Sequence, residues 1–350
     1  MSAPTSTLVA DAEIQPSRSE RRGSGTWRYV GSKVLGSLGA LLFVVVFNFF
    51  LFRVIPGDPV RTLARNRLVS DKQVEELTRT LGLEQPLPQQ FLTYLKNTFT
   101  GEFGLSFRYR QPVGDIIIDR LWPTLLLVGT STILAALIGV YLGMVSAWNR
   151  GKVVDNVSTG FSLTLYSMPE WWLGLVLLAV FAVGAGPIPS LFPTGGLHST
   201  DIQDPNSFAA GLDTAWHLAL PVITLTLAYL AEYSLIMRSS LLDEMGEDYI
   251  TTARAKGLRD VYVRRRHATR NALLPTTTLV VLNLGFVVSG AITIETVFSI
   301  PGLGLLTTEA MDVPDYPVLQ GAFLIFSAAV IFANLIANLA YSWLDPRVRT

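Results

Sequence analysis

Residues 121–149 read LWPTLLLVGTSTILAALIGVYLGMVSAWN, and none of these positions carries a charged side chain. About 20 mostly apolar helical residues are enough to cross a bilayer core of roughly 30 Å. Lipid offers no partner to exposed backbone amides and carbonyls, so a spanning segment of this kind has to be helical. The stretch therefore predicts a transmembrane helix.

Five further stretches meet the same criterion, at residues 34–52, 157–183, 214–237, 274–294 and 316–344. The whole chain agrees with them, because only 15% of its 350 residues are charged, half are hydrophobic and the mean hydropathy is +0.41. A soluble domain carries nearer a quarter charged residues. The sequence predicts an all-α integral membrane protein with six transmembrane helices.

Orientation follows from the lysines and arginines of the short connections, which favour the cytoplasmic side. Five cations precede the first span, two follow the second, seven lie in the loop 243–273 between the fourth and fifth, and two end the chain. The connections at 184–213 and 301–315 have none. The ten cations of 53–120 do not conflict, since long translocated segments escape the rule. Both termini are therefore predicted to be cytoplasmic.

Four regions result from this topology. Residues 1–28 are predicted to be a disordered cytoplasmic tail, 29–52 the first transmembrane helix, 53–120 a small extracytoplasmic module, and 121–350 a five-helix core. Within the module we expect one helix after Ser70 and a second over 89–99. Two interpretations of the module stay open, a loop that packs on the spans and a docking platform for a soluble partner.

The connection between the fourth and fifth spans is unusually basic. Residues 250–275 read ITTARAKGLRDVYVRRRHATRNALLP. We expect Asp248 to cap a short helix over 249–256 and Gly257 to stop it, with a second helix from Asp260 and Pro275 in the first turn of the fifth span. Two interpretations fit, contact of the arginines with lipid headgroups and docking of another protein.

One face of the short helix favours docking. Tyr249, Thr252, Ala253 and Lys256 fall on it by i, i+3, i+4 and i+7 spacing. The small side chains of Thr252 and Ala253 would let another backbone approach closely. The cytoplasmic loop 243–273 is thus a candidate contact site.

Charged residues inside spans are functional candidates because each costs at least ~2.5–3.5 kcal/mol at the bilayer centre. Glu232 lies within the fourth span, and we expect it to face a translocation pathway, where it could contact the amino terminus of a peptide. Asn283 and Glu295 are further pathway candidates. The alternatives are an interhelical hydrogen bond for Asn283 and an interfacial position for Glu295.

Several kinds of chemistry are excluded or unsupported. Without cysteine the chain has no disulfide, zinc-thiolate site or cysteine nucleophile, and its three histidines are too scattered to predict a metal site. The formal net charge of zero gives no sign of a nucleic-acid partner. No G-x-x-x-x-G-K-[S/T] phosphate loop is present. We expect no catalytic residue here, and an energy source in another subunit.

The basic loop resembles that of permease subunits of binding-protein-dependent ABC importers, whose pattern is Glu-Ala-Ala, three residues, Gly and later Leu-Pro. Thr251-Thr252-Ala253 and Gly257 stand at those places here, followed by Leu274-Pro275. Thr251 replaces the usual Glu, and Thr252 an Ala. The dipeptide/oligopeptide branch is similar along nearly the whole chain, in LFRVIPGDPV (51–60), LGLEQPLPQQFLTYL (81–95), GEFGLSFRYRQPV (101–113), SMPEWWLGL (167–175), ETVFSIPGLGLL (295–306), DYPVLQG (315–321) and LDPRVR (344–349).

The resemblance implies a mechanism and a set of partners. The short helix, with Asp248, Tyr249, Thr251, Thr252, Ala253, Lys256 and Gly257 as its expected coupling residues, would dock on a cytoplasmic ATPase. A second homologous permease, two ATPases that hold ATP and Mg²⁺, and an extracytoplasmic peptide-binding protein would complete the importer in the bacterial plasma (inner) membrane. The chain itself would need no cofactor and would not be an enzyme.

Short peptides are the expected cargo. An importer of the same architecture for nickel, glutathione or an oligosaccharide is the first alternative. A secondary transporter driven by an ion gradient is the second, although the paired interrupted repeats typical of such folds are not found.

Overall fold

The structure is a computed structural model that describes residues 22–54, 85–201, 204, 207–286 and 292–344. Over these ranges the chain is almost entirely helical, and β pairing is limited to two isolated bridges. The all-α prediction is confirmed to that extent. The helix expected after Ser70 lies outside the described residues.

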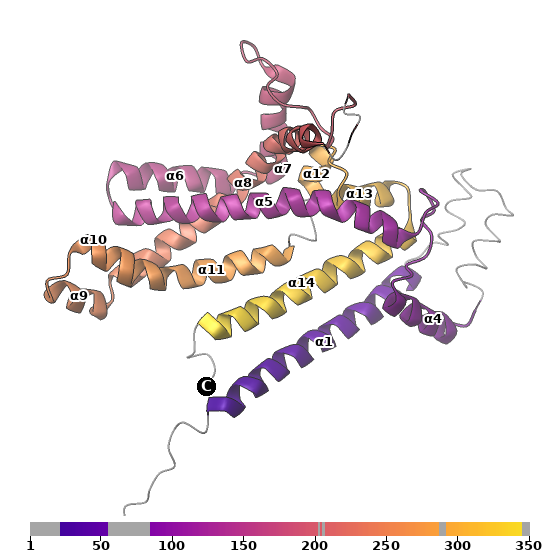
Figure 1. Cartoon of the computed structure of the whole chain (residues 1–350), viewed down its shortest axis with the longest axis horizontal. Coiled ribbons are helices and arrows are strands. Elements are labelled where there is room, and N and C mark those ends of the chain that lie inside the picture. Colours follow the sequence, from indigo (N-terminus) through magenta and orange to yellow (C-terminus); the bar gives the residue numbers. More distant parts are fainter. Residues whose placement is uncertain (1–21, 55–84, 202–203, 205–206, 287–291, 345–350) are drawn as a thin grey trace, which may run out of the picture.

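Long helices dominate the molecule (Figure 1). Four of those described are long and apolar enough to cross a membrane, or five if a bent pair counts as one span. The four are α1 (Arg22–Val54), α5 (Val113–Trp148), α8 (Phe208–Met245) and α14 (Tyr316–Leu344). The last has the bounds predicted for the sixth span, whereas α1 begins inside the stretch predicted to be a disordered tail.

The third predicted span is not one straight helix. It consists of α6 (Val153–Ser167), α7 (Glu170–Leu177) and the π-helix η1 (Leu178–Gly184), and the two halves meet at 100°. Pro169 causes the bend, because proline lacks an N–H and disfavours helical geometry in the residue before it. Met168 is accordingly extended, with φ −89° and ψ 130°. One continuous helix over 157–183 was therefore wrong, and a single bent span at this place stays a prediction.

The fifth predicted span is described only in part. α11 (Thr269–Phe286) forms its first portion and α12 (Ile292–Val297) follows, while residues 287–291 lie outside the described ranges. Pro275 is inside α11 rather than in its first turn, because the helix already begins at Thr269. The next segment, expected to be a plain connection, contains α13 (Leu303–Asp312).

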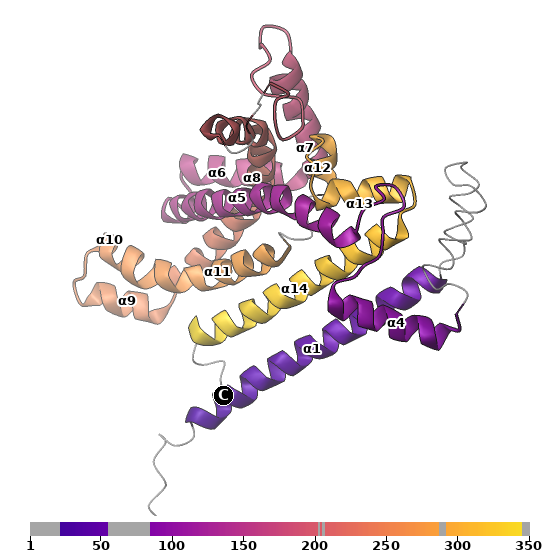
Figure 2. The same ribbon diagram turned by 45° about the vertical axis from the view of Figure 1, so that its right-hand side comes forward.

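Two glycines allow α5 and α8 to pack in close backbone contact. A Cβ added at Gly139 would lie 2.7 Å from the carbonyl oxygen of Leu230, and one at Gly143 would lie 2.5 Å from that of Ser234. Small residues four apart let two membrane helices approach to backbone contact. Both views draw α5 and α8 against each other (Figures 1 and 2), and we call this contact the glycine seam.

The part of 53–120 that the structure describes packs on the same chain. α4 (Leu87–Thr100) lies beside α1, where Asn48 donates to the Tyr94 hydroxyl at 3.3 Å. The loop after α4 is held by Asp315, which accepts from the Ser106 hydroxyl at 2.5 Å and from the Arg108 N–H at 3.1 Å. These contacts favour the packed-loop interpretation for the described half.

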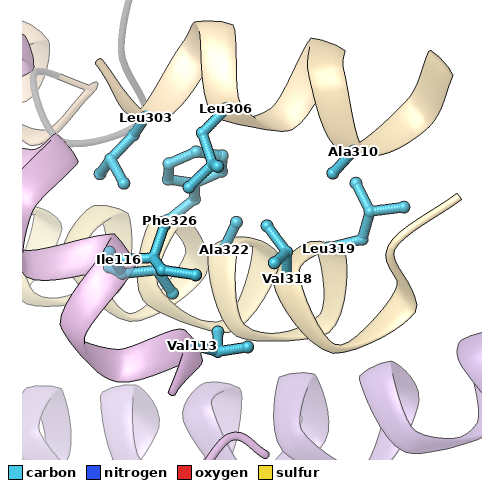
Figure 3. Packing of buried hydrophobic residues seen from close by; sticks show 10 residues of the cluster. Val113, Ile116, Leu303, Leu306, Ala310, Val318, Leu319, Ala322 and Phe326 are labelled. Carbon is cyan, nitrogen blue, oxygen red and sulfur yellow. The ribbon is translucent and has the colours of Figure 1, made fainter. Parts of the chain in front are cut away.

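The loop after α4 packs on an apolar cluster through Phe103 and Tyr109. The cluster joins the start of α5 to α13 and α14, and Figure 3 labels Val113, Ile116, Leu303, Leu306, Ala310, Val318, Leu319, Ala322 and Phe326. The N-terminal end of α5 is thereby fixed, while its other end leads toward the basic connection.

Candidate functional site

The basic connection forms a helical hairpin at one end of the molecule (Figure 1). Its first arm is α9 (Asp248–Ala255), and its second is α10 (Asp260–Tyr262) continued by the π-helix η2 (Val263–Ala268) into α11. We call residues 248–268 the basic hairpin. π-Helical turns are rare and often mark functional positions, and sequence reasoning did not foresee this one.

Gly257 ends α9 as predicted. Its φ of +78° is in the left-handed region that favours glycine. The N–H of Gly257 donates to the Arg254 carbonyl at 2.9 Å, and the N–H of Leu258 donates to that of Ala253 at 3.4 Å. This pair of bonds satisfies the last carbonyls of the helix. The cap expected from Asp248 was wrong, because Glu247 is the N-cap residue and makes no side-chain bond there.

The face of α9 that points into the protein is not the predicted one. Ile250 and Ala253 are buried, at 0% and 7% exposure, against a cluster that includes Met237 and Leu241 of α8 and Ala147 of α5. Ala253 therefore cannot receive a partner's backbone. The outward face carries the remaining predicted coupling residues, Asp248, Tyr249, Thr251, Thr252 and Lys256, all of them exposed.

Tyr249 connects α9 to the two helices that flank the hairpin. Its hydroxyl donates to the Glu244 carboxylate in α8 and accepts from the Asn271 amide in α11 at 3.0 Å. Partial burial, together with the neighbouring Glu244 carboxylate, raises the pKa of Tyr249 to about 12. Tyr249 thus keeps its proton at neutral pH and donates the bond to Glu244.

Asp260 connects the two arms of the hairpin. One carboxylate oxygen lies 3.2 Å from Nε and Nη2 of Arg254 in α9, and the other lies 2.6 Å from Nε of Arg264 in η2. Arg264 also donates from Nη1 to the Trp148 carbonyl, at the last residue of α5, at 3.1 Å. Sequence reasoning treated these arginines only as a charge count and missed the arrangement.

An ion pair with a buried aspartate and a partly exposed arginine joins the same end of α5 and α6 to α8. Arg238 donates from Nε and Nη2 to the two oxygens of Asp155 at 2.7 and 2.9 Å. Asp155 also accepts from the Ser146 hydroxyl at 2.5 Å and from the Gly151 N–H at 2.9 Å. A bidentate pair with further donors is the geometry that compensates for burial. Sequence reasoning did not predict this pair.

The pathway candidates fall in different environments. Glu232 is half-buried in α8 and makes no ion pair or hydrogen bond with another described residue. Its neighbour Tyr233 is fully buried, and the Tyr233 hydroxyl accepts from the Asn283 amide of α11 at 3.0 Å. Asn283 thus makes the interhelical bond that was its alternative interpretation. A pathway role for Glu232 stays a prediction.

Glu295 anchors a helix rather than facing a pathway. It is fully buried, and one of its oxygens accepts from the Thr124 hydroxyl of α5 at 2.8 Å. The other oxygen accepts from the backbone N–H groups of Gly304 and Leu305 at 2.7 and 3.1 Å, in the first turn of α13. A carboxylate at a helix N-terminus satisfies free amides and complements the helix dipole. These contacts count against a pathway position for Glu295, and its interfacial alternative stays a prediction.

Comparison with known proteins identifies the family of the chain. The family model "Binding-protein-dependent transport system inner membrane component" matches residues 139–350, and a model of the N-terminal part of such membrane components matches residues 26–128. The chain belongs to this family. The permease is thus a multi-pass protein of the bacterial inner membrane, and its family carries out transport rather than enzymatic catalysis.

Relatives of the permease are similar over almost their whole length. The glutathione transport system permease protein GsiC of Escherichia coli (strain K12) is 37% identical over 322 residues, which cover 92% of this chain and 98% of the relative. A putative peptide permease protein of Brucella suis biovar 1 (strain 1330) is 38% identical over 326 residues, covering 92% and 99%. The permease is therefore similar to ABC importer permeases of the peptide branch.

Proposed function

We propose that this permease is one of two six-span subunits that form the translocation pathway of an ATP-driven importer for short peptides. Both termini and the basic hairpin lie in the cytoplasm, and residues 53–120 lie outside. The distribution of lysine and arginine supports this orientation, because the cations of the short connections gather at the hairpin end. The bend at Pro169 supports a third span that crosses with its two halves at an angle.

The outward face of α9 is the observation that carries the proposal. The helix is short, its buried side is fixed on α5 and α8, and its exposed side presents Asp248, Tyr249, Thr251, Thr252 and Lys256. A helix held rigidly on one side and free on the other suits docking into a groove of another protein. We assign that groove to a cytoplasmic ATPase, so α9 is the coupling helix.

The partners follow from this assignment. Two ATPases bind ATP and Mg²⁺ inside the cell, a second homologous permease completes the pathway, and an extracytoplasmic binding protein delivers the cargo. Closure of the ATPases on ATP moves the coupling helix and switches the spans between inward- and outward-facing states. This chain then holds no cofactor, since energy enters through the partner subunits.

Short peptides are the cargo class that the relatives favour. One relative is named for glutathione, which is itself a tripeptide, and another for peptides. Within the pathway, the half-buried carboxylate of Glu232 is suited to the amino terminus of such a cargo. It has no hydrogen-bond or ion-pair partner among the residues that the structure describes, and an intramembrane carboxylate in that position gains most from a mobile cation. An uncharged oligosaccharide would bring no cation to this carboxylate.

The test is recovery of the complex. Tagged permease is extracted from its native membrane in mild detergent, and the proteins that accompany it are identified by mass spectrometry, with ATP hydrolysis measured in the presence of a peptide mixture. We expect a second six-span chain and ATPases, and loss of both ATPase recovery and hydrolysis in Thr251→Trp, whose bulk obstructs the outward face. Tyr141→Trp, at an exposed position of α5, is the matched control.

Recovery of the permease alone under every condition would overturn the proposal and favour the ion-driven transporter. Equal ATPase recovery with Thr251→Trp and with Tyr141→Trp would keep the complex and reject α9 as its docking site.

A further inference from the structure

Asp260 occupies a central position in the basic hairpin. It is the one carboxylate that faces cations of both arms, Arg254 on α9 and Arg264 on η2, within the described part of the hairpin. The two pairs are half-exposed, with side-chain exposures of 45% for Arg254, 33% for Arg264 and 48% for Asp260. Exposed pairs of this kind add little to stability, so their value has to be sought in the geometry they fix.

That geometry leads to α5. Arg264 lies against Asp260 through Nε as an ion pair whose N–H is not aligned for a hydrogen bond, and Nη1 reaches the Trp148 carbonyl. Among the described residues this is the one hydrogen bond between the basic hairpin and α5. A cation at the C-terminal end of a helix is also favoured by the helix dipole. Asp260 thus orients Arg264 toward α5 and at the same time forms an ion pair with Arg254 of α9.

The linkage matters because α5 does not move alone. The glycine seam holds α5 against α8 in backbone contact, and near the hairpin Arg238 of α8 donates to the Ser146 hydroxyl of α5 at 3.1 Å. A displacement of α9 that reaches Trp148 therefore reaches both long helices together. Tyr249 links α9 to α8 and α11 by a separate route. Ile250 and Ala253 also pack in an apolar cluster that includes Ala147 of α5, so Asp260 supplies the polar part of the connection to α5.

We propose that Asp260 is a positioning residue that transmits movement of α9 to the α5–α8 unit through Arg254, Arg264 and the Trp148 carbonyl. This inference rests on the proposed function, in which an ATPase moves α9. Loss of the Asp260 charge removes both ion pairs, with Arg254 and with Arg264, without removing any buried contact of α9. The helix still docks and ATP is still hydrolysed, but fewer hydrolysis cycles lead to a conformational change of the spans.

The first experiment measures the linkage in the permease itself. The sequence contains no cysteine, so single cysteines take spin labels specifically. Leu258→Cys, directly after α9 and outside its docking face, and Tyr141→Cys on α5 are both at exposed positions. Pulsed electron paramagnetic resonance gives the distance distribution between the two labels. The full chain with its accompanying subunits is measured in nanodiscs. We expect Asp260→Asn to broaden the distribution, Asp260→Glu to restore it, and Asp243→Asn to leave it unchanged. Asp243 is an exposed carboxylate at the end of α8, so this control removes the same charge nearby.

The second experiment measures the consequence for transport. In proteoliposomes that contain the whole importer, we expect Asp260→Asn to lower the number of peptides imported per ATP hydrolysed by about two- to five-fold, the size that exposed pairs support. Hydrolysis itself and thermal stability are expected to match those of Asp243→Asn. A purely structural role would lower stability and hydrolysis together and leave the ratio unchanged.

The outcomes separate the two proposals. A distance distribution that is the same in Asp260→Asn and Asp243→Asn overturns the linkage, whether or not an ATPase accompanies the permease. A broadened distribution with an unchanged import ratio also overturns it, because movement then reaches α5 by another route. A broadened distribution in a permease that binds no ATPase keeps the mechanical connection, rejects its use in coupling and counts against the proposed function.

Discussion

The glycine seam gives a quantitative prediction for Gly143→Ala. The new Cβ would lie 2.5 Å from the Ser234 carbonyl oxygen and 2.8 Å from the Met237 Cβ, whereas ordinary van der Waals contacts begin at 3.4 Å. Backbone cannot rotate away as a flexible side chain can, so α5 and α8 have to separate locally. Overpacking a close contact in this way costs about 1–3 kcal/mol. We expect the free energy of unfolding to fall by that amount.

Gly129→Ala is the matched control, since this glycine also lies in α5 but a Cβ there would meet nothing within 4 Å. Alanine is the better helix former by up to about 1 kcal/mol, so the control should be neutral or slightly stabilising. Both variants are purified in mixed micelles and unfolded by SDS titration or steric trapping, with helicity as the readout. Indistinguishable unfolding curves for the two alanines would refute the seam as a rigid contact.

Four further perturbations test other parts of the molecule. Gly257→Ala forces alanine into a left-handed φ and should destabilise the hairpin locally by about 1–2 kcal/mol. Local opening of the hairpin should then speed tryptic cleavage at its arginines. Cleavage as slow as in the wild type would contradict the strain. Because the pKa of Tyr249 is raised, the hydroxyl contributes stability below about pH 10 and loses that contribution as the pH rises toward 12. The tyrosinate absorbance titration of Tyr249→Phe, subtracted from that of the wild type, should therefore leave a component with a midpoint near 12. A midpoint at 10 would argue against the Glu244 contact. Glu295→Gln replaces a charged acceptor of several bonds and should lower the free energy of unfolding by about 1.5–3 kcal/mol, an effect that an unchanged SDS midpoint would exclude. Glu232→Gln should weaken uptake of peptides with a free amino terminus more than that of N-acetylated ones, and equal kinetics for both would reject its pathway role.

Composition predicted the helical class and the apolar segments because lipid leaves the backbone no alternative to a helix. It could not predict where a segment bends. Pro169 was visible in the third span, but the 100° angle depends on what α6 and α7 pack against. α13 was missed for a related reason: the helix is short, and its first amides are satisfied by Glu295, a residue of the preceding segment.

The coupling loop shows the same division between local and tertiary information. Gly257 was predictable because a helix stop is a local property of the backbone. The orientation of α9 was not, because spacing groups Tyr249, Thr252 and Ala253 on one side without saying which side the protein covers. Ile250 and the buried cluster around Met237 decide that question, and they turn Ala253 inward.

The Asp155–Arg238 pair sets an order of events during synthesis. The two residues are 83 positions apart in the chain, so at roughly 5–20 residues per second the arginine is made about 4–17 s after the carboxylate. Throughout that interval α5 and α6 stand next to the membrane with a carboxylate that has no arginine. The packing of α5 and α6 can therefore be completed only after α8 has been inserted. A ribosome that stalls between Asp155 and Arg238 leaves a carboxylate without its arginine, which quality-control proteases can distinguish from a finished permease.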